Sequence, residues 1–469
     1  MMILSFHRAG RTPLRRVALA AVLLAPLAAC DTDALLDVED PDVTTPPALF
    51  DPSNLAAVRA SVLGDFAAAY SGAGQTNGLT INSGLMSDEF YFSGTFGQTR
   101  ELDVRAVSLT NGAVATNTRN LYRALRFAEI GAESYAENQP NTAAHAEMLN
   151  LQGFLYIGFA ENFCGAVPFS REAGGEFDYG PPQTTAQILA RAIAAFDQAL
   201  TVATAAGSTA QQNLARVGKA RALVNLGPAS FAEAAALVSG VPTGFSYVVE
   251  HAATTARQNN GVWGLTHGRR EVGMASAEGH NGLAYRVGPL PAADVTVAPD
   301  PRVPWAWRNG SAAGSAYRHF FQKKFPAQET PLPLATGIEA RLIQAEAALA
   351  AGASNAYLPI LNTLRAGIGL AALADPGTAA GRVNQFFAER AFWLYATAHR
   401  LGDMRRLVRQ YGRAKESVYP TGDFLRPASN GTMRNEGTYG TQASIPITFD
   451  ELNNPAFREA QEQCDPNAA

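Results

Sequence analysis

Few side chains in the sequence have types and spacings that indicate catalysis. Adjacent carboxylates occur at Asp88 and Glu89, and two further candidates occur at Glu271 and Glu278. Most glycosidases use two carboxylates that flank the scissile bond, so an exported glycan hydrolase is one hypothesis. Carboxylates that cap helices or face solvent are far more common, and we expect that role for these four. We therefore predict no catalytic residue.

Motifs for metal ions, phosphates and activated nucleophiles are absent from the sequence. It contains no HExxH, no paired CxxC, no GxSxG and no P-loop. Its seven histidines are scattered, and the closest pair, His267 and His280, does not have the spacing of metal ligands. We expect neither a metal ion nor a cofactor.

Aromatic side chains are the remaining candidates for recognition. Trp and Tyr combine a broad apolar face with a polar edge, which suits the stacking of sugar rings or the binding of a peptide. Aromatic residues under long loops can equally be core anchors, and both roles stay open here. The ligand-binding candidates are Phe90, Tyr91, Phe96, Trp263, Tyr285, Trp305, Trp307 and Tyr317.

The first 29 residues have the features of a secretion signal. Four arginines precede the apolar stretch VALAAVLLAPLAA (17–29), which is too short to span a bilayer comfortably. Residues 27–30, LAAC, resemble a bacterial lipobox, in which the cysteine becomes the first mature residue and carries lipid. We predict that Cys30 is lipidated; a plain signal peptide followed by a chance cysteine is the alternative. Two or more acyl chains anchor a protein durably.

The net charge and the remaining cysteines further limit the classes of protein to which this chain can belong. The formal charge of −4 becomes −8 once the four upstream arginines are removed, which argues against nucleic-acid binding. Cys164 and Cys464 are the only other cysteines, and in an exported protein such a pair suggests a disulfide. Two unrelated buried thiols are the alternative.

The elements that must position these residues are predicted to be mainly α-helical. Residues 30–50 are acidic and proline-dotted, which indicates an extended tether, and 51–469 form one large domain. Apolar residues recur three or four apart in 51–71, 111–239 and 338–411, including one helical stripe over 380–411. Small residues around short breaks in 215–238 and 339–366 indicate tetratricopeptide-like helix pairs.

Two stretches and the C-terminus lack this periodicity. Residues 72–110 and 240–337 are rich in Gly, Asn, Ser, Pro and aromatic residues, and we predict loop-rich insertions there. Long loops in a folded domain are commonly functional, so these insertions are where a binding surface is expected. Residues 412–469 are predicted to be an irregular C-terminal segment.

Several blocks of the chain resemble, in order, the SusD/RagB family of outer-membrane nutrient-binding lipoproteins. The segment after Cys30, with Leu36-Asp37 and Pro41, resembles the start of the mature family members. The other matching blocks are GFLYIGFAENFCGAVPF (153–169), DPRVPW (300–305), QKKFP (322–326), EARLIQAEAALAAG with LNTLRAGIGL (339–370), and SIPITFDELNNPAF (444–457). Together they span nearly the whole mature chain.

The sharpest match is ERAFWLYATAHRLGDMRR, residues 389–406. Arg400 and Asp403 would be neighbours on one helix, which indicates structural ion pairing rather than catalysis. Trp393 and Thr397 replace glutamates of the family block and Ala398 replaces its glycine, so we expect a thinner ion network. The predicted structural cluster is Glu389, Arg390, Arg400, Asp403 and Arg406.

The resemblance implies a mainly α fold with tetratricopeptide-like helix pairs and irregular insertions on one side. It also implies a non-catalytic lid of a TonB-dependent, SusC-like barrel that captures a glycan oligomer or a peptide at the outer membrane, facing outward. Asp31 leaves open which of the two membranes holds the protein, because acidic residues after the lipidated cysteine favour inner-membrane retention in enteric bacteria. Two rival classes stay open: an exported α-helical hydrolase and a scaffold lipoprotein that binds only protein.

Overall fold

Helices dominate the computed structural model, which describes residues 46–173, 176–280, 282–352, 356–460 and 463–469. The chain divides into the units Met1–Leu49 and Phe50–Ala469. The predicted signal peptide, Cys30, Asp31 and residues up to 45 of the tether lie outside the described residues. The tether ends in a short 3-10 helix, η2 (Pro46–Phe50).

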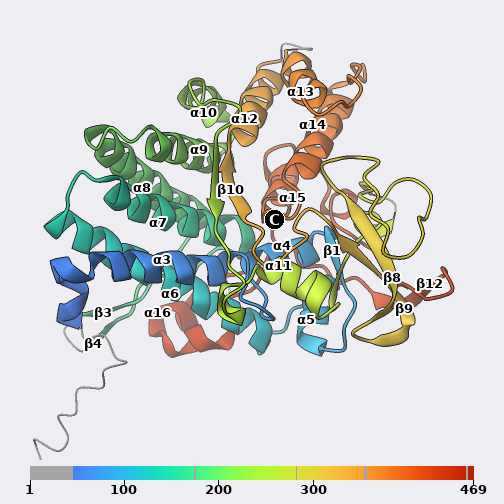
Figure 1. The fold of residues 1–469 in the computed structure, drawn as a ribbon, viewed down its shortest axis with the longest axis horizontal. Coiled ribbons are helices and arrows are strands. Elements are labelled where there is room, and N and C mark those ends of the chain that lie inside the picture. Colours follow the sequence, from blue (N-terminus) through green and yellow to red (C-terminus); the bar gives the residue numbers. More distant parts are fainter. Residues whose placement is uncertain (1–45, 174–175, 281, 353–355, 461–462) are drawn as a thin grey trace, which may run out of the picture. The chain divides into compact units, whose positions relative to one another are not determined.

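Successive helices pack side by side through most of this unit, as Figure 1 shows. After η3 (Pro52–Asn54), the first long helix, α3 (Leu55–Tyr70), packs on α6 (Gly112–Asn138). The array continues with α7 (Ala143–Asn162), α8 (Thr185–Ala205), α9 (Thr209–Leu226), η4 (Pro228–Ser230), α10 (Phe231–Leu237), α12 (Gly337–Ala350), α13 (Tyr357–Ala366) and α14 (Ala379–Trp393). This arrangement confirms the predicted mainly α, tetratricopeptide-like fold.

Polar caps start these helices where the sequence suggests. The Thr184 side chain accepts from the backbone N–H of Gln187, and the Gln187 side chain accepts from the Thr184 backbone, so α8 begins with a complete capping box. Asn111, Thr142 and Thr336 cap α6, α7 and α12 in the same way, each accepting from a first-turn N–H. Such caps contribute about 1 kcal/mol each.

Small residues let the helices of the array approach closely. Phe196 of α8 lies between Gly153 of α7 and Gly218 of α9, and a Cβ at either glycine would come within 2.6 Å or 2.3 Å of its ring. Any side chain there would push the helices apart, so these two glycines set the helix spacing. By length and composition α8 is apolar enough to cross a membrane, but in this fold it packs between α7 and α9.

The two stretches predicted to be loop-rich contain more regular structure than expected. Residues 72–110 hold α4 (Leu79–Met86), β1 (Phe90–Phe92) and α5 (Gly97–Asp103), and most of them are buried. Residues 240–337 hold β6 (Ser246–Val249), η5 (Ala256–Gln258), α11 (Gly261–Trp263), the π-helix η6 (Gly264–Gly268), β7 (Val272–Met274), η7 (Glu278–His280), β8 (Trp305–Ser311), β9 (Gly314–Gln322) and β10 (Leu332–Thr336). Three-residue strands such as β1 and β7, and single helical turns such as α11, are too short to show a period in the sequence.

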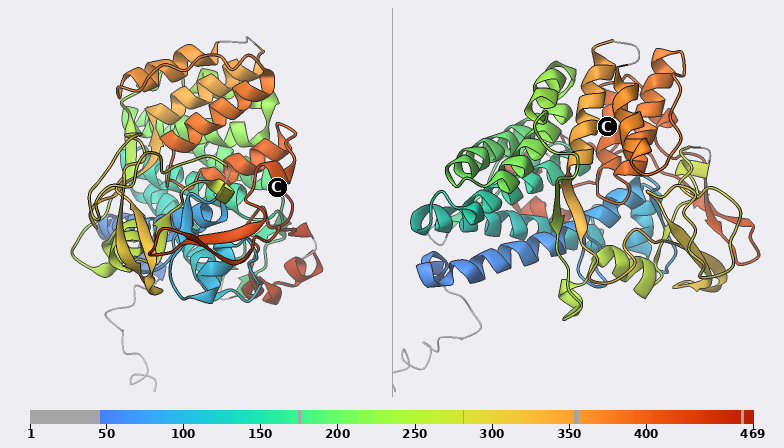
Figure 2. Two further views of the ribbon diagram at one scale, coloured as in Figure 1. Left: turned by 90° about the vertical axis from the view of Figure 1, so that its right-hand side faces the viewer. Right: turned by 45° about the horizontal axis from the view of Figure 1, so that its top comes forward.

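The described strands pair antiparallel in two-stranded sheets. β1 pairs with β7, β6 with β10, and β8 with β9. Residues 412–469 hold η8 (Lys415–Ser417), the pair β11 (Asp423–Pro427) and β12 (Met433–Thr438), η9 (Phe449–Asn453) and α16 (Pro455–Glu459). The remaining pairs are β2 (Val167–Pro168) with β5 (Pro182–Gln183) and β3 (Arg171–Ala173) with β4 (Glu176–Asp178). Figures 1 and 2 show β8, β9 and β12 grouped on the side away from α7 and α8.

One predicted helix is broken in the structure. The helical stripe over 380–411 is divided into α14, which ends at Trp393, and α15 (Arg400–Arg409), with a turn at 394–399 between them. Ala396 and Ala398 have positive φ angles of 56° and 63°, which end the α-helical path. Alanine pays about 1–2 kcal/mol for this conformation, so contacts elsewhere must hold the turn.

The predicted disulfide is present. Cys164, just after α7, bonds to Cys464 across 300 residues, with the two Cα atoms 5.0 Å apart. The Cys164 N–H also donates to the carbonyl oxygen of Ile445 at 3.0 Å. The C-terminal segment is therefore fixed to the end of α7 by covalent and backbone bonds.

Candidate functional site

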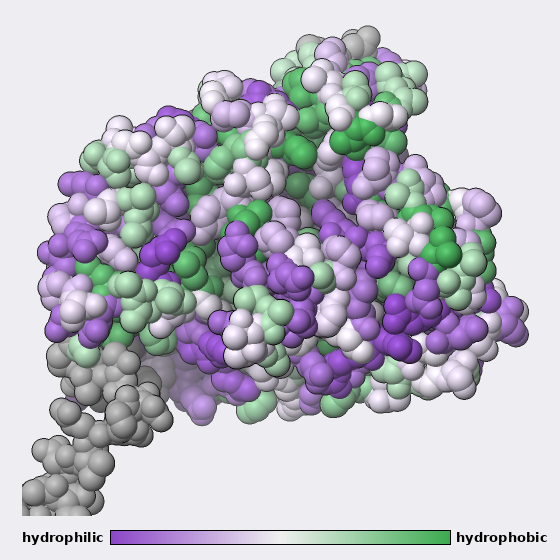
Figure 3. Space-filling model, viewed as in Figure 1, coloured by the Kyte–Doolittle hydropathy of each residue, from purple (hydrophilic) through white to green (hydrophobic). Residues whose placement is uncertain are grey.

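A cleft opens where α12, α13 and the end of α14 meet β10 and the turn at 394–399. It has two adjoining chambers of about 400 Å³ and 410 Å³, which share Ile338, Ile368 and Trp393 in their walls. Figure 3 shows a hollow beneath the upper helices with apolar side chains gathered around it. We call this hollow the central cleft; its volume falls in the range of small-molecule sites.

Trp393 is the aromatic residue of the central cleft. Its partly exposed indole lines both chambers, and its Nε1–H has no hydrogen-bond partner among the described residues. The guanidinium of Arg302 lies 5.1 Å from the indole and 4.9 Å from the ring of Phe392, which holds the Trp393 ring in place by cation–π contact. The Nε1 atom itself is buried, so the cleft presents the aromatic face of the indole rather than its N–H.

Three cationic side chains line the cleft without a carboxylate partner. Within the described residues, no carboxylate oxygen lies within 4 Å of the charged nitrogens of Lys323, Lys324 or Arg341. Lys324 Nζ donates to the carbonyl oxygen of Tyr395 at 2.7 Å, and burial lowers the pKa of Lys324 to about 8. Arg341 donates to the carbonyl oxygen of Val241 at 2.7 Å.

The other charges in the cleft wall are already compensated. Glu339 Oε1 lies 3.9 Å from the Arg221 guanidinium and 3.2 Å from His399 Nε2. Arg302 contacts Asp300 at 2.6 Å and Glu389 at 2.7 Å. The uncompensated charge of the lining is therefore positive.

The turn at 394–399 forms part of the cleft wall and is held from behind. The Ala396 N–H donates to Glu89 Oε1 at 3.0 Å, and the Tyr70 hydroxyl donates to the carbonyl oxygen of Thr397 at 3.0 Å. Burial raises the pKa of Glu89 to about 8 despite the hydrogen bond from Ala396. Left-handed alanines at a cavity wall are strained residues of the kind found at functional sites.

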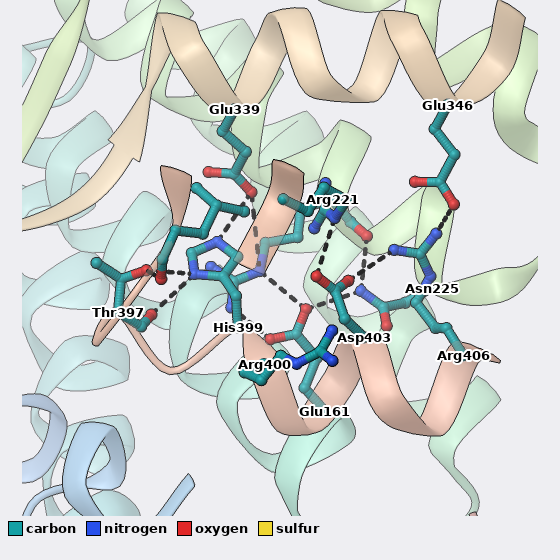
Figure 4. Close-up of polar contacts among 12 residues, drawn as sticks. Glu161, Arg221, Asn225, Glu339, Glu346, Thr397, His399, Arg400, Asp403 and Arg406 are labelled. Carbon is teal, nitrogen blue, oxygen red and sulfur yellow. Dashed lines mark hydrogen bonds and ion pairs between the residues drawn. The ribbon is translucent and has the colours of Figure 1, made fainter. Parts of the chain in front are cut away.

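Behind this turn, α15 carries a buried ion network, drawn in Figure 4. Arg390 lies 2.9 Å from Asp403, and Arg406 lies 3.0 Å from the same carboxylate while also contacting Glu346 of α12. Burial alone would raise the pKa of Asp403, but the guanidinium groups of Arg390 and Arg406 hold it below its usual value. The network joins α12, α14 and α15.

The predicted ion cluster is partly one unit. Arg390, Asp403 and Arg406 are joined, whereas Glu389 pairs with Arg302 and Arg365, and Arg400 pairs with Glu278 at 2.6 Å. Carboxylates outside the block, Glu346 and Glu278, supply the partners of Arg406 and Arg400. Glu161, which accepts from Arg221 and from Asn225, extends the network into α7 and α9.

The predicted aromatic candidates divide into core and surface residues. Phe90, Tyr91, Tyr285 and Trp305 are buried, so they offer no face to a ligand in this structure and their assignment to a binding surface is corrected. Their apolar neighbours in β1, β7 and β9 complete the core under the insertions. The partly or largely exposed residues are Phe96, Trp263, Trp307 and Tyr317.

These four exposed residues do not line the central cleft, and each already has a local partner. Phe96, 57% exposed, lies 5.6 Å from the Arg269 guanidinium. Trp263 stacks on His267 with ring centroids 6.3 Å apart. Trp307 Nε1 donates to Pro291 at 2.8 Å, and the Tyr317 hydroxyl donates to Glu436 at 2.6 Å. They remain candidates for a second contact surface.

The four carboxylates of the hydrolase hypothesis are buried and engaged within the fold. Asp88 accepts from the Tyr439 hydroxyl at 2.7 Å, and burial raises its pKa to about 7. Glu278 is held by Arg400, and Glu271 pairs with Arg269. Of the four, Asp88 borders a cavity of about 20 Å³, too small for a sugar. Among the described residues, no group of three His, Cys, Asp or Glu side chains is arranged to hold a metal ion.

Sequence reasoning missed the main residues of the central cleft. Trp393 stood out only as a departure from the family block, and Lys323 and Lys324 only as part of QKKFP. Two adjacent lysines after an apolar strand were the available signal. Whether a lysine has a carboxylate partner depends on the packing of distant segments.

The chain shares its fold with solved SusD-like proteins. A SusD-like protein from Bacteroides thetaiotaomicron superposes with a TM-score of 0.62 at 13% identity, covering 87% of this chain and 96% of that one. A SusD-like carbohydrate binding protein from Bacteroides vulgatus gives 0.57 at 14% identity, with 87% and 97% covered. A SusD/RagB family protein from Bacteroides thetaiotaomicron gives 0.56 at 15%, with 87% and 96% covered.

Sequence comparisons alone do not reach these proteins. No protein-family model matches the chain, and no curated protein matches it. At such low identity the likeness shows the fold, which is the SusD-like fold over most of the chain. The family resemblance seen in the ordered sequence blocks is confirmed at that level.

Proposed function

We propose that this SusD-like chain is a lipid-anchored binding protein that captures a nutrient, a glycan oligomer or a peptide, for a TonB-dependent, SusC-like outer-membrane transporter. The observation that carries the proposal is the SusD-like fold across most of the chain. A neighbour with this fold is described as carbohydrate binding. The lipobox-like residues 27–30 supply the anchor that such a role needs.

The physical reason for this arrangement is effective concentration. A binding domain tethered beside a pore keeps its ligand near the entrance, so each capture event leads to uptake more often than free diffusion allows. The acidic stretch 31–45 is long enough in sequence to let such a lid open and close. Binding without catalysis suffices for this role.

The partner is tested by co-purification. The lipidated protein is extracted in mild detergent from the cells that make it, and we expect a barrel-sized transporter to accompany it. Recovery without any barrel contradicts the transporter proposal. Recovery with a barrel, but without binding of any glycan or peptide, favours a scaffold lipoprotein.

The anchor is tested separately by labelling. We expect labelled palmitate to be incorporated into the wild-type protein and lost in Cys30→Ser. Label that persists in Cys30→Ser contradicts the assignment of Cys30. Protease accessibility on intact cells then decides the membrane and the face, which Asp31 leaves open.

The absence of turnover is tested with the captured oligomer. We expect no new reducing ends after long incubation of glycan oligomers with the purified protein. If hydrolysis appears, single replacements of Asp88, Glu89, Glu271 and Glu278 identify its origin, and one inactive variant among them supports the hydrolase.

A further inference from the structure

The central cleft has more positive charge than its own fold neutralises. Lys323, Lys324 and Arg341 line it without a carboxylate within 4 Å among the described residues, while Glu339 lies 3.9 Å from the Arg221 guanidinium. Desolvating a cation without a partner is unfavourable, and folds normally avoid it. An anion from outside the chain would supply the missing charge.

We infer that the central cleft binds a sugar oligomer that carries carboxylate groups, with Trp393 stacking on a sugar ring and Lys323 and Lys324 pairing with the carboxylates. This inference rests on the proposed nutrient-binding function and names the chemical class of the nutrient. It places the ligand in the cleft between α12, α13 and the turn at 394–399, rather than on the aromatic residues predicted from the sequence.

Glu89, the carboxyl group that acts electrostatically on Lys324, does not neutralise it. Glu89 lies behind the turn and accepts from Ala396, and its pKa is raised by burial to about 8. At neutral pH this group is therefore largely protonated and uncharged. Lys324 points its ammonium toward the carbonyl oxygen of Tyr395, a dipole that orients the cation without cancelling its charge.

Trp393 supplies the second part of the recognition. Its indole face is partly exposed between the chambers, and its Nε1–H has no partner among the described residues. A pyranose ring offers an apolar face that can stack on the exposed part of this indole, whereas the buried Nε1–H does not reach the cleft. The pairing of Arg302 with Asp300 and Glu389 fixes the guanidinium that supports the ring, so the indole is preorganised.

The cations of the lining and the indole of Trp393 together favour an acidic sugar. The two ammonium groups and the guanidinium that face the cleft are donors, which pair with carboxylate oxygens. A peptide with acidic side chains also offers carboxylates, but the apolar face of a sugar ring suits the face of the Trp393 indole. The two chambers, of about 400 Å³ and 410 Å³, leave room for more than one ring.

Calorimetric titration with paired probes tests the inference. Oligogalacturonate and oligomannuronate are each compared with their carboxyl-reduced forms, which keep the same rings and lose the charge. We expect at least one acidic oligomer to bind about tenfold more tightly than its reduced form, and added salt to weaken that binding. Equal affinity of acidic and reduced forms for both sugars overturns the inference.

Variants locate the site. Lys323 has no hydrogen bond or ion pair through its ammonium in the described structure, so Lys323→Gln is expected to fold normally and to weaken acidic-oligomer binding about fivefold to tenfold. Lys323→Arg is expected to retain it. Lys219→Gln, which removes the same charge from α9 far from the cleft lining, is the matched control and should leave affinity unchanged. Unaltered binding by a folded Lys323→Gln protein contradicts the site.

Two further outcomes separate this inference from the proposed function. Trp393→Leu is expected to weaken acidic and reduced oligomers alike, because stacking does not depend on charge. Oligoglutamate that binds as tightly as the acidic sugars overturns the sugar assignment. If the protein co-purifies with a barrel and binds neutral oligomers as tightly as acidic ones, the proposed function stands and only the acidic-ligand inference fails.

Discussion

Two groups of charged side chains lie on opposite sides of the turn at 394–399. Behind the turn, Arg390 and Arg406 share Asp403, and Arg406 also reaches Glu346. In front of it, Lys323 and Lys324 line the central cleft and have no carboxylate within 4 Å among the described residues. The same turn thus separates compensated from uncompensated cations.

The difference teaches what each group is for. Compensated buried charges fix the relative positions of helices, and removing one partner exposes the cost of burying the other. Uncompensated cations beside a cavity cost stability and are retained only where something else depends on them. Pairing, rather than charge alone, separates a structural arginine from a candidate ligand-binding lysine.

The largest expected effect breaks the network behind the turn. Asp403→Ala leaves Arg390 and Arg406 buried without their shared carboxylate, so we expect the free energy of unfolding to fall by about 3–5 kcal/mol. Denaturant unfolding monitored by circular dichroism measures it. A loss below about 1 kcal/mol would mean that Glu346 alone compensates both arginines.

The opposite sign is expected in front of the turn. The pKa of Lys324 is lowered from 10.5 to about 8 by burial, so at pH 7 its charged form destabilises the folded state. Lys324→Met should therefore raise the free energy of unfolding by about 1–3 kcal/mol below pH 8, after the loss of the bond to Tyr395.

The pH dependence checks the cause of that gain. Between the folded pKa of about 8 and the unfolded value of 10.5, the unfolded chain binds more protons at Lys324, so the wild type gains stability as pH rises. The advantage of Lys324→Met should shrink over this window. An advantage that is constant with pH would point to packing instead of charge.

A pH-dependent effect is expected at the group that holds the turn. The pKa of Glu89 is raised from 4.5 to about 8, so its contribution to stability is full below pH 4.5 and is lost as pH rises through 8. Glu89→Gln keeps an acceptor for the Ala396 N–H. We expect equal unfolding free energies near pH 4.5 and a variant that is more stable by up to about 5 kcal/mol at pH 9, because one pKa unit corresponds to about 1.4 kcal/mol.

The smallest effect is expected at a surface pair. Lys219 lies 2.7 Å from the half-exposed Asp197. Lys219→Gln should lower the free energy of unfolding by less than about 0.5–1 kcal/mol, measured in the same denaturant series. A larger loss would show that the solvent exposure of a charged pair does not predict how much the pair contributes to the stability of this fold.

The helical array was predictable because its signal repeats. Residues 117–138, 184–205 and 338–351 each contain several turns of apolar spacing, and the structure places α6, α8 and α12 over them. Elements such as β1, β7 and α11 inside 72–110 and 240–337 were missed because three-residue strands and single helical turns are too short to show a period. Burial of Phe90 and Tyr285 depends on partners more than 100 residues away, which no local pattern records.

The central cleft was hidden for a more specific reason. The turn at 394–399 interrupts a continuous apolar stripe, yet it contains neither glycine nor proline to mark a break. Ala396 and Ala398 adopt backbone angles that glycine adopts more readily. The turn is held in this conformation by hydrogen bonds that Glu89 accepts and that Lys324 and Tyr70 donate. These contacts are long-range, so a sequence pattern read locally favours one unbroken helix.

The disulfide between Cys164 and Cys464 also orders events during synthesis. Its two halves are 300 residues apart, so α7 emerges with a thiol long before its partner exists. The hairpins, the central cleft and α15 are all made while that thiol is still unpaired. Covalent closure can therefore come only after every residue between the two cysteines has been made.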